Sequence, residues 1–184
     1  MGALAAFGVT GVIYHKLGRA NLKRIFISTA QVTAAVLAIV GSAFVFTQML
    51  VLARVPDAVT EFVVGLEVSP YVVMVGIMLI LVLLGCLVDA ASLLLVVTPI
   101  LVPAVTELGF DPLWFGVLLV VNLEIAVITP PVGLNLYTMK SVVPQLDLAD
   151  IFRGVAPYIA IEGILLAVMI AVPDIATFLP GLLE

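Results

Sequence analysis

The sequence predicts an all-α integral membrane protein in which a re-entrant helical hairpin lies next to a broken helix. Of its 184 residues, 64% are hydrophobic and only 10% are charged, whereas soluble domains are about 25% charged. The mean hydropathy is +1.37. One apolar run also contains Thr129-Pro-Pro-Val-Gly133, which has the residue types that interrupt a helix. We therefore expect one membrane domain over residues 1–184.

The first two elements are a short apolar stretch and a full span. Residues 1–14 are apolar, and the basic residues that follow them begin at Lys16, whereas a secretory signal carries its basic residues first. Because about 20 residues are needed to cross a bilayer, we expect the tail of a helix that starts further upstream. Residues 28–53 contain no charged residue, and Arg54 follows them. This run predicts the first complete span.

Residues 56–69 alternate apolar and acidic side chains. Val59, Phe62 and Val63 recur at helical spacing against Asp57 and Glu61, which is typical of an amphipathic helix at the membrane interface. An ordinary polar connection remains the alternative.

Residues 71–105 form an apolar stretch that is too long for one span and short for two. A re-entrant hairpin fits this length, with its tip near Gly85, Asp89 and Ser92. At that tip Asp89 and Ser92 are candidates for binding an ion or a substrate, directly or through another group. The alternative for Asp89 is a cap on the second helix of the hairpin.

Residues 112–143 predict a broken helix. Asp111 and Pro112 form a helix start. Pro130 and Pro131 lack N–H groups and clash with the preceding turn, so carbonyls around residues 126–129 lose their helical partners. Gly133 tolerates the dihedral angles of a break. After a polar connection, residues 154–172 predict the last span.

The basic residues decide between two topologies. If the hairpin is re-entrant, Arg54 lies on one side of the membrane and the other basic residues of the loops lie on the other side. If both halves of the hairpin crossed the membrane, Lys140 and Arg153 would lie on the same side as Arg54. Basic loops concentrate on the cytoplasmic side, which favours a hairpin that enters from the outer face.

Oxygen atoms near the break predict a sodium site. Irregular backbone at membrane depth lines cavities in carriers, and hard cations prefer oxygen ligands. The candidates are the carbonyl and side-chain oxygens of Thr129, Pro130, Gly133 and Asn135. The alternative is that hydroxyl groups only bond the carbonyls that the prolines release.

Two further carboxylates lie in apolar segments, where charge is costly. Glu124 stands about one turn before the break and is a secondary candidate for accepting freed N–H groups or coupling to protons. Glu162 follows Pro157 by a little over one turn. It could belong to a binding site, or it could pair with a group on another helix.

Several functions are excluded. The only histidine, His15, lies in a basic loop, so neither a Ser-His pair nor a histidine metal site is available at membrane depth. An aspartyl protease would need a second aspartate beside Asp89 in another span. Nothing indicates nucleic-acid binding, and we expect no enzyme activity and no bound cofactor.

The ordered motifs resemble a known family. Gly85-Cys-Leu-Val-Asp-Ala-Ala-Ser92, Thr98-Pro-Ile-Leu-Val-Pro103 and the run through Asn135 resemble the large permease subunit (DctM type) of TRAP transporters, over about residues 5–180. The resemblance implies the C-terminal half of an inverted-repeat, elevator-type carrier in the bacterial inner membrane. It also implies that the hairpin and the broken helix form half of a site for Na⁺ and substrate.

The resemblance further implies Na⁺-coupled uptake of a C4-dicarboxylate, sialic acid or a similar organic acid anion. Its partners would be a small membrane subunit (DctQ type), a periplasmic substrate-binding protein (DctP type) and the N-terminal half of the permease. Two alternatives remain: a non-transporting fragment or accessory membrane protein, and another ion-coupled carrier without a binding-protein partner.

Overall fold

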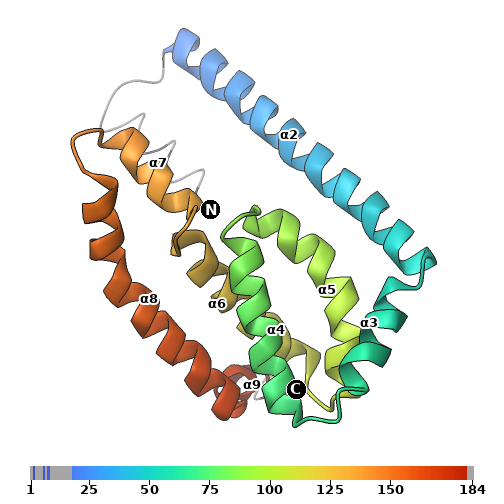
Figure 1. Cartoon of the computed structure of the whole chain (residues 1–184). Coiled ribbons are helices and arrows are strands. Elements are labelled where there is room, and N and C mark those ends of the chain that lie inside the picture. The colour runs from blue at the N-terminus through green and yellow to red at the C-terminus, as the bar shows by residue number, and fades with distance from the viewer. Residues whose placement is uncertain (1, 3–5, 7, 9–17, 182–184) are drawn as a thin grey trace. The chain divides into compact units, whose positions relative to one another are not determined.

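The computed structural model describes residues 2, 6, 8 and 18–181, and over these residues it contains helices and no strands (Figure 1). The predicted helix tail at residues 1–14 lies mostly outside this part of the chain. The structure divides into two compact units, residues 1–42 and 43–184, and each is described by itself. One membrane domain over residues 1–184 stays a prediction.

Three helices are long and apolar enough to cross a membrane, among the residues that the structure describes. They are α2 (Arg19–Leu52), α5 (Ala90–Glu107) and α8 (Leu148–Ala171). The division between the two units falls inside α2, which has no buried residue along its described length. A helix of 34 residues is about 51 Å long, which exceeds the roughly 30 Å hydrocarbon core of a bilayer.

Helix α3 (Val55–Val64) occupies the segment predicted as an interfacial helix or a polar connection. Arg54 precedes it with a left-handed φ of 58°, and Pro56 lies in its first turn. Val63 is buried, while Phe62 on the other face is exposed. Helix α3 packs against α5.

The predicted hairpin consists of α4 (Pro70–Gly85) and α5, joined by a turn at residues 86–89. Helix α4 is about 24 Å long, which is shorter than a full span. Pro99 interrupts the hydrogen bonds of α5 without ending the helix, because the carbonyl of Leu95 accepts a bond from the hydroxyl of Thr47 at 3.3 Å. Re-entry into the membrane stays a prediction.

The chain then forms α6 (Pro112–Ile128), α7 (Leu134–Val142), α8 and α9 (Asp174–Gly181). Residues 129–133 separate α6 from α7, so the helix is interrupted at the two prolines. Helix α8 starts at Leu148, before the position of about 154 that the sequence indicates. This early turn is supported by packing, because Ile151 is buried.

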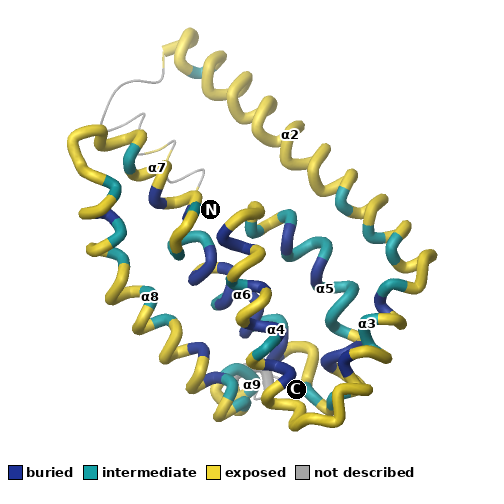
Figure 2. The backbone as a smooth tube through the Cα atoms, in the orientation of Figure 1, coloured by how far each residue is buried: buried dark blue, intermediate teal, exposed yellow. Residues whose placement is uncertain are grey.

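The core of residues 43–184 surrounds α6. Figure 2 shows buried residues along the inner faces of α4, α5 and α6, whereas much of α8 is exposed. Helices α4 and α5 each pack against α6 more than against one another. The indole Nε1 of Trp114 on α6 donates to the carbonyl of Met169 on α8 at 2.9 Å, so α6 and α8 are antiparallel neighbours at this point.

Candidate functional site

The end of the first hairpin helix touches the helix that breaks. A β-carbon built on Gly85 would lie only 2.6 Å from the β-carbon of Ala126 and 3.6 Å from side-chain atoms of Leu123 and Leu93. Glycine is therefore the residue that allows α4 to approach α6 this closely. The hairpin tip and the last turns of α6 form one local site.

Asp89 in the tip caps the second hairpin helix. Its Oδ2 accepts hydrogen bonds from the backbone N–H of Ser92 at 2.9 Å and from the Ser92 hydroxyl at 3.1 Å. This is the arrangement of a helix N-cap, the alternative that the sequence left open for Asp89. Asp89 is exposed and Ser92 is half-buried, so the tip remains accessible.

Thr129 bonds two carbonyl groups at the end of α6, and one of them, that of Ala126, is released by Pro130. The hydroxyl of Thr129 donates to the carbonyl of Ile125 at 2.6 Å, and its backbone N–H donates to the carbonyl of Ala126 at 3.2 Å. The carbonyl of Val127 would need a donor at residue 130 or 131, and both are prolines without an N–H. Val127 therefore supplies a carbonyl oxygen that the helix itself cannot bond.

Gly133 turns the chain into α7. Its φ is 53°, in the left-handed region, and a β-carbon there would lie 2.8 Å from the side chain of Leu136 and 3.2 Å from the carbonyl oxygen of Thr129. The carbonyl of Thr129 thus points back toward Gly133 across the break. Pro130 and Asn135 are exposed, and the Pro130–Pro131 peptide bond is cis.

This arrangement offers neutral oxygen atoms at a helix break beside a hairpin tip. Carbonyl oxygens and exposed amide and hydroxyl groups suit a hard cation with flexible coordination. The alternative also has support, because the backbone N–H of Thr129 bonds the Ala126 carbonyl that Pro130 releases, and its hydroxyl bonds the carbonyl of Ile125. The carbonyls of Val127 and Thr129 are among the oxygens that these bonds leave over, and the roles of the predicted site residues stay predictions.

The other carboxylates lie apart from this arrangement. Glu124 is exposed on α6, and Thr129 rather than Glu124 bonds the backbone near the break. Glu162 on α8 has one carboxylate oxygen that is buried without a hydrogen-bond partner among the described residues. In that same part of the chain, no group of three or more His, Cys, Asp or Glu residues could hold a metal ion.

Asn122 is a polar residue to which the sequence interpretation assigned no role. It is fully buried on α6, on the same face as Phe115, Leu118 and Ala126. The signal was present in the sequence, because these positions recur at helical spacing and Asn122 is the polar one among them.

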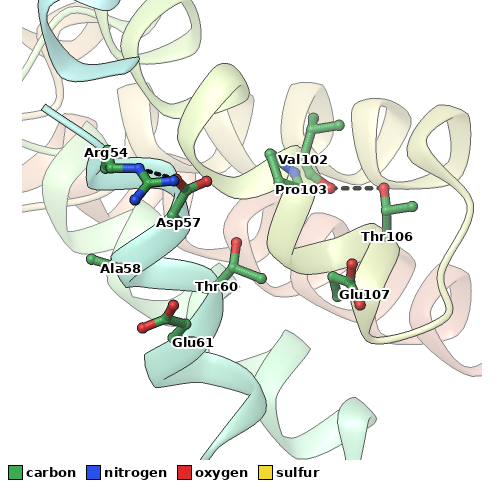
Figure 3. A pocket seen from close by; sticks show the side chains of 9 residues that line it. All are labelled: Arg54, Asp57, Ala58, Thr60, Glu61, Val102, Pro103, Thr106 and Glu107. Carbon is green, nitrogen blue, oxygen red and sulfur yellow. Dashed lines mark hydrogen bonds and ion pairs between the residues drawn. The ribbon is translucent and has the colours of Figure 1, made fainter. Parts of the chain in front are cut away.

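A separate cavity of about 820 Å³ lies between α3 and α5 and contains none of the predicted site residues (Figure 3). Arg54 and Asp57 form an ion pair there, with 3.3 Å between Nε and Oδ2. The hydroxyl of Thr106 donates to the carbonyl of Val102 in its own helix. Both interactions are local within one helical turn. The cavity is separate from the tip and the break, because no residue of either segment lines it.

Comparison with protein families gives a match over nearly the whole chain. Residues 1–175 match the model of the DctM component of the tripartite ATP-independent periplasmic transporter.

Several curated relatives are similar as well. The chain is 36% identical to the 2,3-diketo-L-gulonate TRAP transporter large permease protein YiaN of Escherichia coli K12, over 95% of this chain and 41% of the relative. It is 31% identical to the C4-dicarboxylate TRAP transporter large permease protein DctM of Rhodobacter capsulatus, over 100% of this chain and 41% of the relative.

It is also 31% identical to the sialic acid TRAP transporter large permease protein SiaM of Vibrio cholerae, over 98% of this chain and 42% of the relative. The chain thus spans about two fifths of the length of the curated relatives that it matches. Together with the hairpin and the broken helix, these matches show that the chain belongs to the DctM family of TRAP transporter permeases.

Proposed function

We propose that this chain takes part in Na⁺-coupled uptake of an organic acid anion as a segment of a TRAP large permease. Family membership supports a permease in a three-part system, since the family is the DctM component of a tripartite periplasmic transporter. The single observation that carries the proposal is the contact of Gly85 with Ala126, because it brings a hairpin tip against a helix break with free carbonyl oxygens.

The break supplies the proposed cation ligands. The carbonyls of Val127 and Thr129 are among the backbone oxygens that the local hydrogen bonds leave over, and Asn135 is an exposed amide in the first turn of α7. Broken transporter helices use unwound carbonyls in this way to hold a coupling ion. Asp89 and Ser92 orient the tip, and Gly85 lets it approach.

The substrate class follows from the relatives alone. Their names give 2,3-diketo-L-gulonate, C4-dicarboxylates and sialic acid, which are all organic acids. The proposed partners are a small membrane subunit, a periplasmic substrate-binding protein and the remaining part of a full-length permease. The other half of the binding site would come from that remaining part of the permease.

Uptake of a radiolabelled organic acid tests the proposal. The chain is placed in a full-length permease with the two other components in membrane vesicles, and uptake is measured with and without an imposed sodium gradient. Uptake should rise with the gradient and collapse when sodium is replaced by choline. Uptake that is unchanged by sodium would refute the coupling.

Two glycine variants test the location of the sodium site. Gly133→Ala places a methyl group against the Thr129 carbonyl and should raise the sodium concentration that gives half-maximal uptake. Gly109→Ala is the matched control, because Gly109 also has a positive φ, of 87°, but its added methyl group meets nothing within 4 Å. If both variants need the same sodium concentration for half-maximal uptake, the helix break is not part of the sodium site.

The fragment alternative makes a different prediction. If the chain serves only assembly, Thr129→Ala and Asn135→Ala will leave uptake by the complete transporter unchanged. If the break holds the coupling ion, Asn135→Ala will weaken the sodium dependence because it removes a side-chain ligand, and Thr129→Ala will weaken it because it removes the hydroxyl that bonds the Ile125 carbonyl beside the break.

A further inference from the structure

Asn122 is a buried amide whose hydrogen-bonding capacity is unused. None of its surface is exposed, and neither Oδ1 nor Nδ2 has a partner among the described residues. Leaving a buried polar group unbonded costs about 1–3 kcal/mol, so buried amides in proteins normally have partners. This residue therefore points to a group that the described residues do not supply.

Asn122 lines a cavity of about 420 Å³ between α4, α6 and α8. Small-molecule sites typically have volumes of about 300–1,000 Å³. The small residues Gly163 and Ala167 lie among the larger apolar side chains that line the cavity on α8, and a β-carbon on Gly163 would meet nothing within 4 Å. The cavity is therefore larger than a packing defect of one methyl group, and the Asn122 amide, which has no exposed surface, would reach a ligand there by a rotation of its side chain.

The lining defines the chemistry of the occupant. All other described residues around the cavity are apolar or glycine, and none of them is charged. An ionic head group would be left without a counter-charge, which is costly in an apolar site. Asn122 supplies one acceptor and one donor group, so the matching head carries a hydroxyl beside a carbonyl.

The cavity opens at a surface that is itself apolar. Leu79 on α4 is exposed at 61%, and Ile164, next to Gly163 on α8, is exposed at 65%. In a membrane protein such a surface meets lipid chains, so a ligand would enter from the bilayer. We propose that this cavity binds one uncharged single-chain lipid of the monoacylglycerol type, with its head on Asn122 and its chain along Gly163 and Ala167.

Trp114 provides the probe for this site. It is the only tryptophan of the chain and is 1% exposed. It bonds the carbonyl of Met169, and the next residue, Ile170, lines the cavity. A brominated acyl chain in the cavity would therefore lie near the indole and quench its fluorescence.

The experiment titrates the full chain in detergent micelles with a monoacylglycerol brominated on its acyl chain. A saturable quenching component should appear at one ligand per chain and should be displaced by the unbrominated lipid. Gly163→Leu, which fills the cavity, should abolish it. Gly154→Leu on the same helix is the matched control and should retain it, because Gly154 also has open space around it but lies outside the cavity.

Asn122→Leu tests the head group. It should weaken the affinity about 5- to 150-fold, the effect of two neutral hydrogen bonds, without abolishing the binding. If Gly163→Leu does not give a folded protein by circular dichroism, Ala167→Leu replaces it. The proposal does not depend on sodium coupling, so it can fail while the proposed function holds.

Three results would overturn the proposal. They are the absence of a saturable component, saturable quenching that survives both cavity-filling variants, and an affinity unchanged by Asn122→Leu. A fourth result would assign the cavity to a protein helix: no lipid binding by the chain, together with loss of assembly of a full-length permease that carries Gly163→Leu.

Discussion

Gly85→Ala should force the hairpin tip away from α6. The added β-carbon would lie 2.6 Å from the β-carbon of Ala126, whereas carbon atoms in contact are about 3.5–4.0 Å apart. The two segments must therefore separate by about 1 Å. Because the opposing atom is a β-carbon fixed to the backbone, it cannot swing away as the end of a flexible side chain would.

The expected cost follows from overpacking, which is typically about 1–3 kcal/mol. Alanine gains about 0.5–1 kcal/mol over glycine within a helix, so the net loss should be about 0–2.5 kcal/mol. Gly76→Ala on the same helix provides the control, because its β-carbon would meet nothing within 4 Å. That variant should be as stable as the wild type or more stable.

Cys86 reports the displacement directly. It is the only cysteine, follows Gly85 in the chain and is 2% exposed, so its reaction with a maleimide should be slow. In Gly85→Ala the reaction should become several-fold faster, while Gly76→Ala should leave it unchanged.

A second substitution should reverse the effect. Ala126→Gly removes the opposing β-carbon, so the double variant Gly85→Ala/Ala126→Gly should regain slow labelling and most of the lost stability. If Gly85→Ala labels no faster than Gly76→Ala, or if Ala126→Gly does not restore protection, the close contact of tip and broken helix is not what holds Cys86 buried.

Three further substitutions test hydrogen bonds that stabilise α6, and each is measured by thermal unfolding in detergent. Thr129→Val removes the hydroxyl from the Ile125 carbonyl and should cost about 1–3 kcal/mol, whereas Thr129→Ser keeps the donor and should restore most of it. Trp114→Phe leaves the buried Met169 carbonyl without its donor and should cost a similar amount; an unchanged midpoint would mean that this bond does not tie α6 to α8. Asp111→Ala removes the cap of α6 and should cost about 0.5–2 kcal/mol, while Asp111→Asn should be nearly neutral.

The sequence predicted the coarse features of this protein well. Its all-α membrane fold class, its family and its location in the bacterial inner membrane are confirmed. The physical reason is that long apolar runs allow few solutions in a bilayer, and helices are the solution that bonds their own backbone. Pro130 and Pro131 lack donors whatever surrounds them, so the interruption of the helix could be inferred without knowing its neighbours.

The contacts between segments could not be predicted in the same way. That Gly85 faces Ala126 depends on how α4 rotates against α6, and a uniformly apolar helix gives no sign of which face is inside. The unbonded state of Asn122 likewise depends on what three helices place around it. The sodium site at the break, the partners and the substrate remain predictions.

The convergence of short helices at the tip and the break has an electrostatic consequence. Helices α4 and α6 end there, with the partial negative charge of their C-termini, and α5 and α7 begin there, with the partial positive charge of their N-termini. Each end carries roughly half an elementary charge, so the four macrodipoles nearly cancel. A cation alone or an anion alone would then be poorly compensated, whereas the two bound side by side would each face helix ends of the opposite sign.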